Sequence, residues 1–169
     1  PAHLHIPIAL DCIALGKHMV TASYVSKEMQ ELNQRAVEAG VIIMNEVGVD
    51  PGKDHLSAMK VLDEVKESGG KIRIFESFTG GLLAPESEYG NPWQYKFTWN
   101  PRNVVLAGSG SSVKFKQEGK YKYIPYHQLF RRTEIVDIEN YGRFEGYANR
   151  DSLKYRSEYG LDDIPTIYR

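Results

Sequence analysis

The chain lacks a second cysteine, because Cys12 is the only one among its 169 residues. An internal disulfide is therefore excluded, and no secretory leader pattern is visible, so we expect a cytoplasmic protein. An excess of either charge is also missing, since 21 lysines and arginines are balanced by 22 acidic residues. This balance gives no field to attract nucleic acid or an anionic membrane. A small-molecule partner is the remaining expectation.

Long apolar runs are absent as well. The longest, Ile6 to Leu15, contains Asp11 and is too short to cross a bilayer, so no membrane association is expected. His3 and His5 are two residues apart, which places them on different faces of a helix and predicts no metal site. The sequence contains no Gly-x-Gly-x-x-Gly, P-loop or Gly-x-Ser-x-Gly motif and no internal repeat.

What is present is the composition of a globular domain, with 41% hydrophobic and 25% charged residues. In the first part, helical and strand patterns alternate in the rhythm of a doubly wound parallel sheet whose elements are buried. The expected elements are a buried helix at Leu4 to Leu15, a strand at Met19 to Ser23, a helix from the N-cap Ser26 to Gly40, and a strand at Val41 to Met44.

The pattern changes at a loop from Asn45 to Asp54, which marks a predicted boundary between residues 1–47 and residues 48–169. The later part mixes helices with strands and includes a hairpin predicted to have one aromatic, apolar face and one lysine face. The expected elements are a helix around Ala58 to Val65, a strand at Lys71 to Phe78, a loop from Gly80 to Pro92, a helix around Arg102 to Ala107, the hairpin at Val113 to Ile124, strands at Ile135 to Ile138 and Phe144 to Tyr147, a helix at Ser152 to Tyr159, and a final strand at Thr166 to Arg169. Because the chain opens and stops inside such patterns, we expect a fragment of a longer protein.

Two side chains follow predicted strands at the edge where open α/β sheets bind ligands. Asp50, in the turn Gly48 to Gly52, can orient a substrate amine or relay its proton, or it can simply satisfy amides of that turn. Tyr24 follows the strand before it and offers a hydroxyl donor, or it serves packing.

Two further segments could bind a carboxylate. Thr79 precedes the paired glycines at Gly80, whose amides can approach a ligand closely, although a plain loop opening has the same composition. Arg150 precedes the predicted helix at Ser152, where its guanidinium can bind a carboxylate or pair with Asp151.

Five motifs together resemble the glutamate-forming saccharopine dehydrogenases, including the dehydrogenase half of aminoadipic semialdehyde synthase. They span nearly the whole chain in the same order. They are V-T-A-S-Y at Val20 to Tyr24, M-N-E-V-G-V-D-P-G-K-D-H at Met44 to His55, T-G-G-L-L-A-P-E at Thr79 to Glu86, Y-K-F-T-W at Tyr95 to Trp99, and N-R-D-S at Asn149 to Ser152.

The resemblance implies an α/β fold, in which the end of a Rossmann-like parallel sheet is followed by a mixed α/β (α+β) domain for substrate binding and dimerisation. Residues 1–47 would be the last part of the cofactor domain, and residues 48–169 part of the saccharopine-binding catalytic domain. The cofactor would be NADP or NAD. Because the glycine-rich phosphate loop is not in the chain, the fragment is expected to bind dinucleotide poorly and to be inactive alone.

The resemblance also implies roles for particular residues. The reacting centre would contain Tyr24 and Asp50, and the substrate would further contact Thr79, Gly80, Thr98, Asn149 and the carboxylate clamp Arg150. The nicotinamide would face Ser23 and Val49 to Pro51. Thr79 stands where fungal and animal members usually have cysteine, so any role for a titrating thiol at that position is excluded.

The implied reaction is NAD(P)-dependent oxidation of saccharopine to glutamate and aminoadipate semialdehyde, a step of lysine metabolism, by a homodimer. Two alternatives remain open at this point. One is a related dehydrogenase for another amine-linked carboxylate, such as carboxynorspermidine. The other is a fragment that serves chiefly as a dimerisation module through its hairpin.

Overall fold

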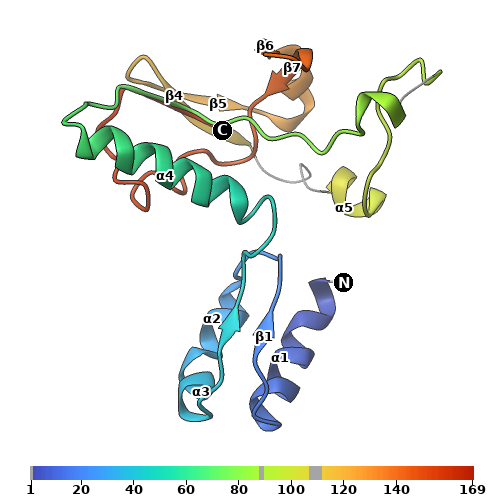
Figure 1. Ribbon diagram of the computed structural model, residues 1–169, viewed down its shortest axis with the longest axis vertical. Coiled ribbons are helices and arrows are strands. Elements are labelled where there is room, and N and C mark those ends of the chain that lie inside the picture. Colours follow the sequence, from blue (N-terminus) through green and yellow to red (C-terminus); the bar gives the residue numbers. More distant parts are fainter. Residues whose placement is uncertain (1, 88–89, 107–111) are drawn as a thin grey trace. The chain divides into compact units, whose positions relative to one another are not determined.

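The computed structural model describes residues 2–87, 90–106 and 112–169 (Figure 1). The chain forms two compact units, Pro1–Val61 and Leu62–Arg169, and its fold is mixed α/β. In the described ranges no helix combines the length and the apolar character needed to span a bilayer. The domain boundary between residues 47 and 48 stays a prediction.

The first unit, drawn blue to cyan in Figure 1, alternates helices with two short parallel strands, as the sequence pattern predicts. Met19 pairs with Ile43, and Val20 pairs with Met44. The elements are η1 (Ala2–Leu4), α1 (His5–Ala14), β1 (Met19–Val20), α2 (Lys27–Glu31), α3 (Asn33–Glu38), β2 (Ile43–Met44) and the first part of α4 (Lys53–Glu67).

The expected long helix after Ser26 forms as two shorter ones. The Ser26 hydroxyl accepts the Met29 amide at 3.1 Å and so caps α2, as predicted. The helix is interrupted at Leu32, which ends α2 and precedes α3. Gly40 then ends the segment in the left-handed conformation, with φ of 65°.

The core of this unit includes residues of α1, α2, α3 and β1. Its buried side chains are Ala9, Ile13, Met19, Met29, Leu32, Ala36 and Val41. The expectation that α1 is buried all round is wrong, because Ile8 remains 43% exposed and Leu15, just after the helix, 71% exposed. The strands are likewise covered on one side, since Met19 is buried whereas Val20 is exposed.

The second unit contains a four-stranded mixed sheet and a separate two-stranded hairpin. The larger sheet has the order β3-β8-β4-β5, in which β8 runs parallel to β3 and antiparallel to β4. The elements after α4 are β3 (Ile74–Glu76), η2 (Pro85–Ser87), α5 (Pro101–Leu106), β4 (Val113–Gln117), β5 (Lys120–Ile124), η3 (Tyr126–Arg131), β6 (Thr133–Ile138), β7 (Gly142–Tyr147) and β8 (Thr166–Tyr168). The strands, the hairpin of β4 and β5 and α5 were all predicted, although β3 is shorter than expected and the pairing of β6 with β7 was not predicted. Two predictions reach beyond the described residues, at 88–89 in the loop and at Ala107 in the helix.

The hairpin of β4 and β5 forms as predicted, but its faces differ from the expectation. Glu118 and Gly119 make the two-residue turn with φ of 50° and 78°. The resulting register pairs Lys114 with Tyr123 and Lys116 with Tyr121. Directly paired residues share a face, so the exposed tyrosines lie among the lysines rather than opposite them.

The predicted helix at Ser152 to Tyr159 is wrong, because this segment forms a series of turns. The residues before it are held by β4 instead. Arg150 has φ of 31°, and its carbonyl accepts the Lys114 amide at 2.7 Å, while the Ser152 amide donates to the Lys114 carbonyl at 2.8 Å. These long-range hydrogen bonds replace the helix start that local sequence indicates.

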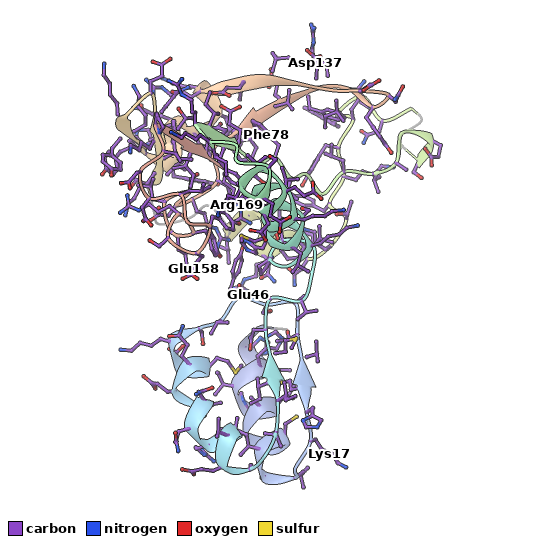
Figure 2. All side chains as sticks on the ribbon, turned by 60° about the vertical axis from the view of Figure 1, so that its left-hand side comes forward. Lys17, Glu46, Phe78, Asp137, Glu158 and Arg169 are labelled. Carbon is purple, nitrogen blue, oxygen red and sulfur yellow. The ribbon has the colours of Figure 1, made fainter. Side chains whose placement is uncertain are left out.

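The core of the second unit contains Tyr168, which is 4% exposed. Its ring lies 5.0 Å from that of Phe115 and 5.8 Å from that of Phe78, centroid to centroid (Figure 2 labels Phe78). Burial, with Glu134 and Glu76 nearby, raises the pKa of the Tyr168 phenol to about 12. The folded state therefore favours the protonated phenol.

This raised pKa predicts a loss of stability in alkali. Stability from the neutral phenol is complete below the ordinary tyrosine pKa of 10.0 and is lost as the pH rises towards about 12. The full effect is about 2 kcal/mol. We expect the thermal midpoint of the full-length protein to fall more steeply with pH than that of Tyr168→Phe. Tyr141→Phe, at a side chain that is 70% exposed, is the matched control. Parallel curves for Tyr168→Phe and the wild type would contradict the assignment.

Candidate functional site

The first unit brings together the two residues predicted at the reacting centre. The Tyr24 hydroxyl donates to Oδ1 of Asp50 at 2.8 Å. Tyr24 is half-buried in the loop that follows β1, and Asp50 is exposed in the loop that follows β2. Since β1 and β2 are parallel, both loops leave the same edge of the strand pair, which is why residues 26 positions apart meet.

The turn that carries Asp50 is closely constrained. The Asp50–Pro51 peptide bond is cis, the Gly48 amide donates to the Pro51 carbonyl at 2.9 Å, and the Gly52 amide donates to Oδ1 of Asp54 at 2.8 Å. A side chain at Gly52, which has φ of 145°, would overlap the Gly48 carbonyl oxygen. Glycine is therefore required at this position, because a side chain would clash and the backbone conformation is one that other residues rarely adopt.

The residues predicted to face nicotinamide surround this pair. Ser23 precedes Tyr24, and its carbonyl accepts the Glu46 amide at 3.0 Å. Val49 is 65% exposed, whereas Pro51 is buried beneath the turn. Val49 thus offers an exposed apolar side chain next to the exposed Asp50, whereas Pro51 does not, and the contact of these residues with nicotinamide stays a prediction.

The second unit contains a cavity of about 400 Å³ that includes two of the predicted substrate residues, Asn149 and Arg150. Residues of β4, β7, α5 and η3 and of the segment before α5 form the rest of its wall. The complete lining is Tyr95, Phe97, Val104, Val105, Val113, Tyr126, Leu129, Phe130, Tyr147, Ala148, Asn149 and Arg150. A largely apolar wall that includes one arginine and one asparagine suits a ligand that combines an aliphatic chain with a carboxylate.

The backbone around Arg150 is fixed by contacts with β4 and the end of the chain. The Asn149 amide donates to the Arg169 carbonyl at 2.7 Å, and the buried Ser152 hydroxyl accepts the Arg169 amide at 3.0 Å. Figure 2 labels Arg169. Asp151 lies 3.7 Å from the ammonium of Lys114, so this lysine is an ion-pair partner of the aspartate. These contacts fix the backbone conformation from which the Arg150 side chain extends.

The remaining predicted substrate residues lie in two neighbouring segments. A Cβ on Gly81 would lie 3.6 Å from the Thr98 hydroxyl, so the paired glycines are adjacent to the Y-K-F-T-W motif. Thr79 and Gly80 are exposed and do not line the cavity. Thr98 is also outside its wall, although its neighbour Phe97 is part of it. A role for these three residues in binding stays a prediction.

Sequence reasoning missed the aromatic wall of the cavity. The rings of Phe130 and Tyr147 meet edge to face at 5.0 Å, and those of Tyr95 and Phe97 at 5.7 Å. Burial, with Tyr95 and Tyr126 nearby, raises the pKa of Tyr147. Two features of the sequence indicate this wall. Tyr95 and Phe97 alternate within the Y-K-F-T-W motif, and Tyr147 lies two residues before Asn149.

Comparison with known proteins places this mixed α/β chain in a family. The model of the saccharopine dehydrogenase C-terminal domain matches residues 48–169. The chain belongs to the saccharopine dehydrogenase family, as its five motifs predict.

Individual relatives agree with this assignment. A saccharopine dehydrogenase [NADP(+), L-glutamate-forming] of Schizosaccharomyces pombe is 43% identical over 169 residues, which is 100% of this chain and 37% of the relative. An alpha-aminoadipic semialdehyde synthase of Arabidopsis thaliana is 39% identical over 100% of this chain and 16% of its own length. The solved apo saccharopine dehydrogenase (L-Glu forming) of Saccharomyces cerevisiae matches with a TM-score of 0.87 and 38% identity, over 100% of this chain and 38% of that one. The chain therefore spans well under half of the relatives it matches.

Proposed function

We propose that the protein is a saccharopine dehydrogenase that forms glutamate and aminoadipate semialdehyde with NADP or NAD. The observation that carries the proposal is the hydrogen bond between Tyr24 and Asp50, because it joins two of the five family motifs at a strand edge. The cavity beside Arg150 and the names of the relatives support the same substrate class.

The reaction requires removal of a hydride from carbon and a proton from nitrogen at the secondary amine of saccharopine. The product is an imine, to which water adds before the carbon–nitrogen bond breaks to release glutamate and the semialdehyde. Oxidised nicotinamide, when bound, supplies the hydride acceptor. In the reverse direction the same groups serve reductive condensation.

The residues of this chain have distinct parts in that chemistry. Asp50, with Tyr24 donating to one of its oxygens, can accept a hydrogen bond from the substrate amine and hold its proton while the imine forms. Arg150 binds a substrate carboxylate through its planar guanidinium, and Asn149 adds an amide contact. Thr79, Gly80 and Thr98 add further polar contacts to the substrate.

The cofactor contacts proposed for this chain are limited to the nicotinamide end, at Ser23 and Val49 to Pro51. The chain has no Gly-x-Gly-x-x-Gly motif for the pyrophosphate. The name of the S. pombe relative specifies NADP(+), which favours that cofactor. We further propose that the parallel β1–β2 pair ends a Rossmann-like sheet, that the protein is a homodimer, and that it is cytoplasmic.

The test is the reduction of NADP and of NAD by the purified full-length protein with saccharopine as the substrate. We expect absorbance at 340 nm to rise with one of the two cofactors and glutamate to appear in equal amount. Carboxynorspermidine is the matched competitor. Turnover of that compound alone would replace saccharopine by another amine-linked carboxylate, and folded protein inactive with both would overturn the proposal.

A further inference from the structure

Glu46 connects the two loops that carry Tyr24 and Asp50. Its Oε1 accepts the Val25 amide at 3.1 Å, and its own amide donates to the Ser23 carbonyl at 3.0 Å. Tyr24 therefore lies between two residues that are both tied to Glu46, which Figure 2 labels in the first unit. The backbone on each side of the reacting tyrosine is fixed from the neighbouring loop.

Two further hydrogen bonds between these loops lie on the amino-terminal side of Tyr24. The Val47 amide donates to the Thr21 carbonyl at 3.1 Å, and the Asn45 side-chain amide reaches the Ser23 carbonyl at 3.4 Å. These bonds hold the part of the loop before Tyr24. The part after it is held by the Glu46 carboxylate, which is the contact that a change of side chain can remove.

The backbone conformation of Glu46 also points to a specific use of its side chain. Its φ is 61°, in the left-handed region where glycine and asparagine are favoured and glutamate is uncommon. Glycine has no side chain and that of asparagine is one methylene shorter, so neither can replace the hydrogen bond from the Val25 amide to Oε1 of Glu46, the Glu46 bridge. The hydrogen bond between the Glu46 carboxylate and the Val25 amide explains why glutamate occupies this strained position.

We propose that Glu46 is a positioning residue that fixes the backbone of Tyr24 so that its hydroxyl meets Asp50. The consequence for catalysis rests on the proposed function, since it requires Tyr24 and Asp50 to serve the reacting amine. Glu46 itself acts through Tyr24.

Three variants of the full-length protein separate the bridge from other effects. Glu46→Gln keeps an acceptor oxygen at the same reach. Glu46→Asn tolerates the left-handed backbone but is one methylene shorter, so it loses the bridge. Glu38→Ala removes an exposed glutamate that accepts a hydrogen bond from Gln34 at 2.8 Å on α3, and it is the matched control.

The rate of hydrogen exchange at the Val25 amide reports whether its hydrogen bond to Glu46 is formed. Steady-state kinetics measures the effect of that hydrogen bond on catalysis. We expect Glu46→Asn to accelerate exchange at Val25 and to lower kcat/KM for saccharopine about fivefold, the scale of one ordinary hydrogen bond, because Glu46 acts on the reaction only through Tyr24. Glu46→Gln and Glu38→Ala should stay within about twofold of the wild type in both measurements.

A double-mutant cycle distinguishes positioning from a general loss of structure. In the Tyr24→Phe background, Glu46→Asn should cause no further loss of kcat/KM, because the hydroxyl it positions is already gone. Independent, multiplicative losses, or unchanged exchange at Val25 in Glu46→Asn, would overturn the inference. A wild type that is inactive with saccharopine but has a protected Val25 amide, lost in Glu46→Asn, would overturn the proposed function and leave the bridge standing.

Discussion

We expect Arg150→Ala to weaken saccharopine binding to the full-length protein about thirtyfold or more, or roughly 2 kcal/mol, because a charge-assisted pair with a carboxylate is lost. Alanine and arginine both carry a Cβ, so the cost of the unusual φ of 31° is the same in both proteins. The change therefore reports on the guanidinium. Calorimetric titration of saccharopine in the presence of NADPH or NADH measures it.

Two further variants show whether the loss is specific. Arg150→Lys keeps the charge without the planar fork and should fall between the wild type and Arg150→Ala. Arg143→Ala removes an exposed arginine that pairs with Asp137 at 2.9 Å on the β6–β7 hairpin, away from the cavity lining (Figure 2 labels Asp137). Equal affinity in Arg150→Ala and Arg143→Ala would show that Arg150 is no clamp.

The second large effect is expected at Asp50. Asp50→Asn keeps an oxygen that can accept the Tyr24 hydroxyl but removes the negative charge available to the substrate amine. We expect kcat/KM for saccharopine to fall about tenfold or more, the scale of a lost charged hydrogen bond or a displaced proton acceptor. The decrease should appear in kcat, because a proton is transferred in the chemical step.

The control for Asp50 is an exposed carboxylate of the same unit that lies on a helix. Asp11→Asn changes an exposed aspartate in α1 and should leave kcat/KM within about twofold of the wild type. Tyr24→Phe combined with Asp50→Asn should lose less than the product of the two single effects, since the residues share one hydrogen bond. Full multiplicativity would show that they act separately.

Local sequence predicted the order of the elements because each is bounded by residues with clear conformational preferences. Ser26 caps α2, Gly40 closes α3, and Gly119 completes the hairpin turn, all as expected. The side chains on each face of that hairpin can also be derived from the sequence. A two-residue turn pairs Gln117 with Lys120, and counting outward places Tyr121 and Tyr123 on the lysine face.

The remaining errors come from contacts that local patterns do not contain. Residues after Asn149 have a helical composition, yet Lys114 of β4 and Arg169, which follows β8, hold Arg150 and Ser152 by long-range hydrogen bonds. The burial of α1 was overestimated. An apolar sequence shows which side chains of a helix can be buried, but it does not show how many of them other elements cover. Tyr24 and Asp50 were predicted to share a site because both follow parallel strands. The aromatic wall of the cavity could not be predicted in this way, because the conformations of the connecting loops determine which aromatic residues meet.

The hydrogen bonds around Arg150 also determine when this residue can bind anything. The segment that carries it is anchored to β4, more than thirty positions earlier, and to Arg169, the last residue of the chain. Such distant pairings form late in folding, because long loops must close first. During synthesis, the arginine therefore acquires its final orientation only after the residues of β8 have emerged and joined the sheet. The proposed affinity for a carboxylate would then report on completed folding, and removal of β8, which pairs with β4, would abolish it.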